Sequence, residues 1–329
     1  MSCKISRRSF LKVSGCLMLG SAVSGLLCGA GDPAEGGAAV PTVGGLRVNY
    51  IRAFAKDYGN NFRQMEIHLN IENTNSSAAY FNQENFVPLL GNSRYGGERT
   101  FTGLNKWNGS RYVQDVQLKA GETQTISYSC KLQPEDLSAG LRAVDPAPWS
   151  LTLLYGGQRQ TFTGYLLPDR YSTEYTAGPV ESTVLPSVGG IVLSGFWSSD
   201  LLTQVPSYSL PIYFTMQNSN DTAAQLPFRG VAENGDVLDN FIIRMDGQPR
   251  NHYRLYACTH TSRFTPEEKG HLETLQPQEI CFAETGISLT KDEYSTLYTT
   301  GHTLEITFSY GDESVTVRGN TRTGIFEAI

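Results

Sequence analysis

Two cysteines and two histidines lie within 24 residues in the second half of the chain: Cys258, His260, His271 and Cys281. Two thiolates and two imidazoles would satisfy a tetrahedral zinc ion. However, a single residue separates Cys258 from His260 and 22 residues separate the two cysteines, whereas a zinc finger places its ligands in regular close pairs. We therefore predict no metal site, and Cys258 and Cys281 remain candidates for a disulfide between two strands.

Paired carboxylates occur at three places, Glu135-Asp136, Glu267-Glu268 and Asp292-Glu293. Two such groups facing one another across a cleft would suit general acid and base catalysis. Each pair also stands where a short helical turn would begin, and the helix dipole stabilises negative charge there. The chain has no P-loop, G-x-S-x-G or H-E-x-x-H motif. The sequence thus favours a non-catalytic protein without a cofactor and names no catalytic residue.

An aromatic loop in the first half is a candidate ligand contact. Trp107 stands in the polar stretch Lys106-Trp107-Asn108-Gly109, with Tyr95 and Tyr112 nearby in sequence. Exposed aromatic rings can stack on sugar rings, although a tryptophan in a loop also commonly folds back onto the edge of a core. Tyr95, Trp107 and Tyr112 are therefore predicted contacts for a glycan or another ligand.

The N-terminus has the layout of an export signal: a basic segment, an uncharged apolar segment over residues 13–27, and small residues up to position 30. The basic segment closely resembles the twin-arginine motif, through Ser6, Arg7, Arg8, Phe10, Leu11 and Lys12. We expect residues 1–30 to be recognised by the twin-arginine (Tat) translocase, which would place the folded protein outside the cytoplasm.

Two ways of processing this signal remain open. Cys28-Gly29-Ala30 suits simple cleavage, while Leu26-Leu27-Cys28 resembles a degenerate lipobox whose cysteine would carry a lipid. A lipid at Cys28 would be the protein's one contact with a membrane. Residues 31–40 are rich in glycine and alanine and should form a flexible tether in either case.

Charge argues against nucleic acid as a partner. The whole chain has 26 Lys and Arg against 32 Asp and Glu, and the four basic residues of the predicted signal would be lost on processing. Phosphate contacts require clustered positive charge, which the remaining acidic chain does not offer.

An internal repeat sets the domain organisation. Residues 41–46 match 186–191, and residues 69–79 match 214–224, both at an offset of 145. Near the end of each copy, Tyr155-Gly156 matches Tyr310-Gly311 at an offset of 155, so the second copy contains a net insertion of ten residues. A repeat of this length is a duplicated domain. We predict domains at 41–170 and 186–329, joined by a linker at 171–185.

Apolar residues alternate with polar ones inside each copy, as in Met65, Ile67, Leu69 and Ile71. A period of two indicates half-buried strands. Gly156-Gly157 predicts a tight hairpin, and Thr290 with Glu293 could cap one helical turn. The predicted fold class is all-β, with two β-sandwiches in tandem.

Three segments carry a resemblance to a known group of domains: Asn73-Thr74-Asn75, Phe86-Val87-Pro88-Leu89, and the stretch from Leu118 to Thr123. Together they resemble the immunoglobulin-like domains of unknown function found on bacterial exported lipoproteins. The resemblance implies a sandwich fold outside the cytoplasm and brings no catalytic residues. The expected function is a binding or surface-interaction module with a protein or glycan partner. A carbohydrate-binding protein, or a metalloprotein or enzyme exported in its folded state, are the alternatives.

Overall fold

The computed structural model describes residues 41–57, 63–90, 93–94, 99–103, 115–132, 147–167, 170–198, 202–204, 207–226, 228–231, 237–252, 256–258, 274–297 and 300–329. The predicted export motif, Cys28 and the tether lie outside this part of the chain. Within it, no helix combines the length and the apolar character needed to cross a membrane.

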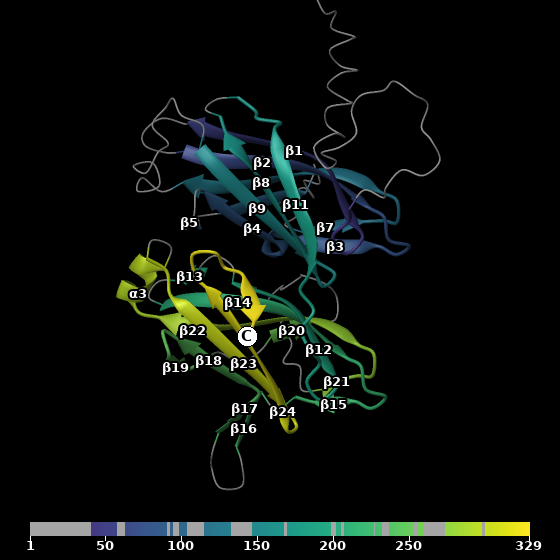
Figure 1. Cartoon of the computed structure of the whole chain (residues 1–329), viewed down its shortest axis with the longest axis vertical. Coiled ribbons are helices and arrows are strands. Elements are labelled where there is room, and N and C mark those ends of the chain that lie inside the picture. Colours follow the sequence, from purple (N-terminus) through teal and green to yellow (C-terminus); the bar gives the residue numbers. More distant parts are fainter. Residues whose placement is uncertain are drawn as a thin grey trace, which may run out of the picture.

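The described chain is almost entirely β, which confirms the predicted fold class. Its helical elements are η1 (Gln83–Asn85) and α3 (Lys291–Thr296). The capping box predicted for Thr290 and Glu293 is present at the start of α3, with both reciprocal hydrogen bonds formed. Antiparallel sheets in two stacked halves make up the rest (Figure 1).

The first half is a sandwich of two antiparallel sheets. One sheet has the order β1 (Leu46–Asp57), β2 (Arg63–Asn73), β8 (Thr123–Leu132) and β6 (Arg99–Gly103). The other has the order β11 (Tyr175–Ser182), β10 (Gln158–Leu166), β9 (Ala147–Tyr155), β4 (Phe86–Leu90) and β5 (Ser93–Arg94). A short pair, β3 (Ala79–Asn82) and β7 (Asp115–Leu118), lies beside them. Alternate residues of both sheets, among them Ile67, Tyr128 and Leu151, form one buried core.

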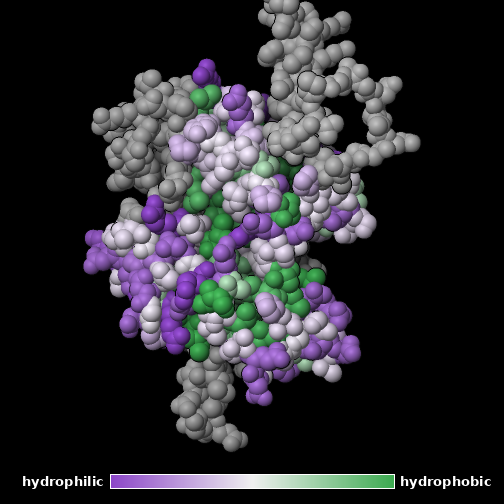
Figure 2. All heavy atoms as spheres, in the orientation of Figure 1, coloured by the Kyte–Doolittle hydropathy of each residue, from purple (hydrophilic) through white to green (hydrophobic). Residues whose placement is uncertain are grey.

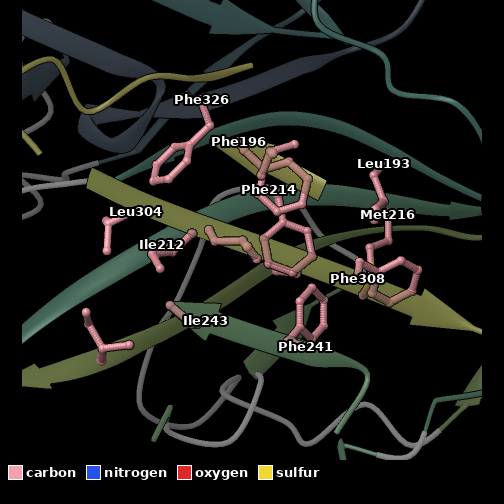
Figure 3. Packing of buried hydrophobic residues seen from close by; sticks show 14 of the residues in the cluster. Leu193, Phe196, Ile212, Phe214, Met216, Phe241, Ile243, Leu304, Phe308 and Phe326 are labelled. Carbon is pink, nitrogen blue, oxygen red and sulfur yellow. The ribbon is translucent and has the colours of Figure 1, made fainter. Parts of the chain in front are cut away.

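The second half repeats this arrangement. Its first sheet has the order β12 (Ile191–Ser198), β14 (Ser207–Asn218), β22 (Ile280–Leu289) and β20 (Tyr256–Cys258), with β13 (Leu202–Gln204) also paired to β14. Its second sheet has the order β19 (Gln248–Arg250), β18 (Phe241–Met245), β23 (Thr303–Tyr310), β24 (Glu313–Asn320) and β25 (Phe326–Ala328). The short pair is β15 (Ala224–Gln225) with β21 (Thr274–Leu275). Phe196, Phe214, Phe241 and Phe308 pack at the centre of a separate core (Figure 3).

The two repeated blocks, residues 41–46 and 69–79 in the first copy, contact each other in the structure. The equivalent blocks of the second copy do the same. The Asn75 amide donates to the Gly44 carbonyl at 3.0 Å, and Asn220 donates to Gly189 at 2.9 Å. Gly45 has φ +83°, and a Cβ at this position would collide with the Asn75 side chain. Each Gly-Gly turn therefore fits against its asparagine only while glycine is present.

The ten-residue insertion in the second copy corresponds to a hairpin made of β16 (Phe228–Val231) and β17 (Val237–Asp239). Ala79 and Ala224 still match at an offset of 145. Asn85 donates to the Leu154 carbonyl and Asn240 donates to the Ser309 carbonyl, so by this point the offset has grown to 155. The hairpin projects from the end of the second half that lies away from the first (Figure 1).

The interval 171–185 is predicted above as a linker, and the structure corrects this. Residues Tyr175–Ser182 form β11, which pairs with β10 at the edge of the first sandwich. The strand has no apolar alternation because most of its side chains are exposed or half-buried. Gly178 and Pro179 are tolerated because an edge strand uses its hydrogen-bonding groups on one side alone.

Candidate functional site

The two sandwiches meet through the outer faces of two sheets, those containing β4 and β9 in the first half and β12, β14 and β22 in the second. The buried residues of this contact form a third hydrophobic cluster of Val87, Leu154, Trp197, Tyr213 and Phe282. Hydrophobic residues also reach the molecular surface along this boundary (Figure 2). Beside the cluster, Arg159 of β10 reaches across to Glu327 of β25 at 2.7 Å.

A bulge in β12 supplies the tryptophan of this contact. The pairing register between β12 and β14 shifts between Ser194 and Trp197, and Gly195 within the bulge has φ +63°. The extra residue changes which side chains face the core. Phe196 consequently packs inside the second sandwich, stacked on Phe214 with ring centroids 4.7 Å apart, while Trp197 points to the other domain.

A pocket with a volume of about 280 Å³ opens beside this cluster, with one wall from each half. The first half contributes Tyr80 and the β9–β10 hairpin, which includes Leu154, Tyr155 and Gln158. The second half contributes Ser194, Trp197, Thr215, Ile280 and Phe282. The lining contains no Asp, Glu, Lys, Arg, His or Cys among the described residues.

Hydrogen bonds hold the polar side chains of the first wall in place. The Tyr80 backbone N–H donates to the Tyr155 hydroxyl at 3.2 Å, and Gln117 donates to the Tyr80 hydroxyl at 2.8 Å. The Gly44 N–H donates to Gln158 Oε1 at 2.8 Å. Burial raises the pKa of Tyr155 above its ordinary value, although the hydrogen bond from Tyr80 opposes the shift. The wall is therefore uncharged at neutral pH.

The pocket lining contains two enclosed polar atoms that the described chain leaves without a partner. Ser194 and Thr215 hydrogen-bond to each other across β12 and β14. By contrast, the Trp197 indole N–H and the hydroxyl of Thr183, a further lining residue, are buried and meet no hydrogen-bond partner among the described residues. Buried polar atoms are usually satisfied in native proteins, so such exceptions call for an explanation.

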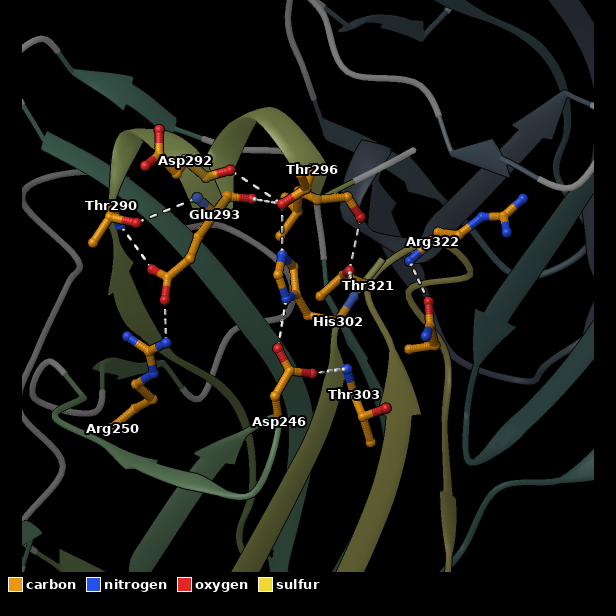
Figure 4. Close-up of polar contacts among 12 residues, drawn as sticks. Asp246, Arg250, Thr290, Asp292, Glu293, Thr296, His302, Thr303, Thr321 and Arg322 are labelled. Carbon is orange, nitrogen blue, oxygen red and sulfur yellow. Dashed lines mark hydrogen bonds and ion pairs between the residues drawn. The ribbon is translucent and has the colours of Figure 1, made fainter. Parts of the chain in front are cut away.

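A separate polar cluster in the second half brings together Asp246, His302 and Thr296 (Figure 4). His302 Nδ1 lies 2.7 Å from Asp246 Oδ2, and His302 Nε2 lies 2.9 Å from Thr296 Oγ1. The order carboxylate, imidazole, hydroxyl resembles a nucleophile triad. However, Thr296 Oγ1 also lies 3.1 Å from the Asp292 carbonyl, as expected for a threonine bonded back to its own helix. We interpret the cluster as a connection that ties α3 to the β18–β19 turn and to β23.

This cluster makes a pH-dependent contribution that can be measured. Burial would raise the pKa of Asp246, but hydrogen bonds from His302 and the Thr303 N–H outweigh it and lower the pKa below 3.8. A lowered carboxyl pKa stabilises the fold above the ordinary value and loses this effect as the pH falls through the lowered one. We expect Asp246→Asn to reduce the free energy of unfolding at pH 6 by about 1 kcal/mol or less, since the side chain is half exposed.

Urea unfolding of wild type and Asp246→Asn between pH 6 and pH 2 checks this, and the difference should shrink below pH 4. Asp312→Asn is the control, because Asp312 lies exposed in the β23–β24 turn. A difference that stays constant over the whole pH range would contradict the assignment.

The ligand contacts predicted in the first half stay predictions. Tyr95, Trp107 and Tyr112 lie outside the described residues, as do His260 and His271. Among the described residues, no group of three or more metal-ligating side chains is found.

The disulfide predicted between Cys258 and Cys281 stays a prediction, because the side chain of Cys258 lies outside the described residues. Cys281 is buried in the second core. In the backbone register, Cys258 lies directly opposite Phe282, while Cys281 lies opposite Met216 on the other side of β22. Neighbouring positions on a strand face opposite sides of the sheet. Cys281 therefore serves as a small apolar residue.

Comparison with known proteins adds no family assignment: the chain matches no protein-family model and no curated protein sequence.

Proposed function

We propose that this protein is an exported, non-catalytic binding module in which two immunoglobulin-like sandwiches hold a ligand pocket between them. The pocket supports this most directly, because both domains contribute to it and its walls are aromatic and uncharged. Ligand sites are typically concave and mostly apolar, with a few polar groups that fix orientation, and they often lie at domain interfaces.

The difference between the two copies gives further support. The sheet face that carries the second wall has an equivalent in the first copy, on β1, β2 and β8. There, Arg52 stands in the place of Trp197, His68 in the place of Tyr213, and Thr125 in the place of Phe282. The equivalent face is thus polar, and Asn70 donates to Thr125 at 2.9 Å on it. Its polar residues suit contact with water, whereas the aromatic ones cluster where the two domains meet.

The chemistry of the lining favours binding over catalysis. General acid and base catalysis needs a titratable group near the reacting atoms, held by a partner that orients it. The two titratable groups of the lining are the phenols of Tyr80 and Tyr155, and burial makes Tyr155 harder to ionise. Such a site can hold a ligand but has little with which to transform it.

A thermal-shift panel tests this proposal. Neutral and charged saccharides, peptides and apolar compounds would be added to the purified two-domain chain, and at least one class should raise the melting temperature. Ile280→Trp places a large ring at the pocket entrance, where Ile280 is 56% exposed, and should abolish the rise. Thr123→Trp is the matched control at the equivalent exposed position of the first copy. No response from any class, or an equal response in both variants, would overturn the proposal.

Export by the twin-arginine route has its own prediction. Replacing Arg7 and Arg8 together with lysine should leave the precursor folded in the cytoplasm, because the translocase reads the arginine pair as an address. Cell fractionation followed by immunoblotting measures the outcome. Lys4→Arg, a change in the same basic segment but outside the motif, serves as the control and should be exported normally. Normal export of the double-lysine variant would exclude this route.

A further inference from the structure

We infer that the interdomain pocket takes a small, uncharged and largely apolar ligand that carries a hydrogen-bond acceptor. This inference rests on the proposed function, since it names the ligand class of the same site. The duplication supports the inference, because most residues that line the pocket can be compared with a counterpart in the other copy.

The β9–β10 hairpin of the first wall lacks the charges of its counterpart. Gly157 and Gln158 occupy the positions of Asp312 and Glu313 in the β23–β24 turn. Gln158 Oε1 accepts from the Gly44 N–H at 2.8 Å, and Glu313 Oε2 accepts from the Gly189 N–H at 2.6 Å. The fold therefore requires an acceptor at this position but no charge. The uncharged residue of this pair, Gln158, is the one that lines the pocket.

The second wall is also less polar than the equivalent face of the first copy. Ile280 occupies the position of Thr123, and it remains 56% exposed at the pocket. Ser194 and Thr215 hydrogen-bond to each other where Asn49 and Asn70 do so in the first copy, so two amides are replaced by two smaller hydroxyls. An ionic ligand would lose its hydration here without gaining a counter-charge, and a hydroxyl-rich saccharide would find few partners.

The enclosed polar atoms indicate the one polar feature of the ligand. Trp197 is 2% exposed, and its indole N–H has no acceptor among the described residues. The Thr183 hydroxyl oxygen is also buried and has no hydrogen-bond partner among the described residues. A carbonyl or ether oxygen on the ligand would satisfy such a donor, and an indole N–H can only donate.

The size of the pocket limits the ligand. Its volume of about 280 Å³ is somewhat below the usual range for drug-sized ligands, about 300–1,000 Å³. An engineered apolar cavity of about 150 Å³ holds one benzene. A two-ring molecule or a short acyl group therefore fits.

Prodan, a neutral naphthalene with a ketone oxygen, is a suitable probe because its emission shifts to the blue in an apolar site. We expect the two-domain chain to bind Prodan with a blue shift, and to bind naphthalene-2-sulfonate at least tenfold more weakly. Gln158→Glu places a carboxylate in the wall while keeping the acceptor for Gly44, and should weaken Prodan binding at least tenfold. Glu313→Gln, the reciprocal change in the other copy, should leave binding unchanged.

The melting temperature of each variant reports whether it is folded. If Gln158→Glu fails to fold, Ile280→Thr takes its place, with Thr123→Ile as the reciprocal control. If neither Gln158→Glu nor Ile280→Thr weakens Prodan binding, the proposed ligand class is wrong. It is also wrong if the chain binds naphthalene-2-sulfonate more tightly than Prodan. If a saccharide or peptide stabilises the chain and Ile280→Trp removes the effect while Prodan does not bind, the ligand class is wrong and the binding function stands. If neither Prodan nor any compound of the panel binds at the pocket, the proposed ligand class and the proposed binding function are both wrong.

Discussion

Replacing Asn73 with alanine is expected to lower the free energy of unfolding of the first sandwich by about 3–5 kcal/mol, since buried groups left without partners cost about 1–3 kcal/mol each. Asn73 is fully buried at the end of β2. Its amide donates to the carbonyls of Ser77 at 2.8 Å, Leu118 at 3.0 Å and Lys119 at 3.2 Å, and its Oδ1 accepts from the Asn75 N–H at 3.0 Å. Alanine removes all four bonds, and the backbone groups that lose them are buried or part-buried.

Urea unfolding followed by tryptophan fluorescence measures this loss. Asn218→Ala should have a similar effect on the second sandwich, because Asn218 makes the equivalent bonds to Thr222, Leu275 and Asn220. Asn70→Ala is the control on the same strand. Asn70 lies half-buried on the outer face and bonds to other side chains, so we expect a loss of about 1 kcal/mol. Equal losses for Asn73 and Asn70 would show that the buried asparagine is not the cause.

Much of the fold could be read from the sequence because the features that specify it are local. Alternating side chains mark β2 and β14, the glycines at 156 and 157 have φ +57° and +71° as the predicted hairpin requires, and the repeat marks the duplication. The asparagine motif that suggested the family resemblance proves to be a turn connection. It therefore carries information about the fold and none about the ligand.

The pocket could not be read from the sequence because its walls come from positions far apart in the chain. Leu154 and Trp197 meet because two sheets stack, and stacking leaves no periodic pattern. The bulge at Gly195 also turns Trp197 away from the core that simple alternation would assign to it. One signal was available: the aligned repeat shows an aromatic residue in one copy against a charged one in the other, as at Trp197 and Arg52.

That difference predicts a second large effect. Trp197→Ala is expected to lower the free energy of unfolding by about 3–5 kcal/mol, as for other buried aromatic residues replaced by alanine. The indole is 2% exposed, and its ring centroid lies 6.1 Å from that of Tyr213 and 5.8 Å from that of Phe282. Because Leu154 and Val87 of the first domain belong to the same cluster, the loss should also weaken the contact between domains.

Two measurements distinguish the loss of stability from the weakened contact between the domains. Urea unfolding gives the loss of stability, and limited proteolysis reports whether the boundary between the sandwiches has become accessible. Arg52→Ala is the matched control, because Arg52 occupies the equivalent position and lies 5.1 Å from the centre of the Tyr171 ring on an outer face. Removing such a cation–π contact should cost only about 0.5–1 kcal/mol. If Trp197→Ala were no more destabilising than Arg52→Ala, the aromatic cluster would not hold the domains together, and a pocket that depends on their fixed spacing would lose its physical basis.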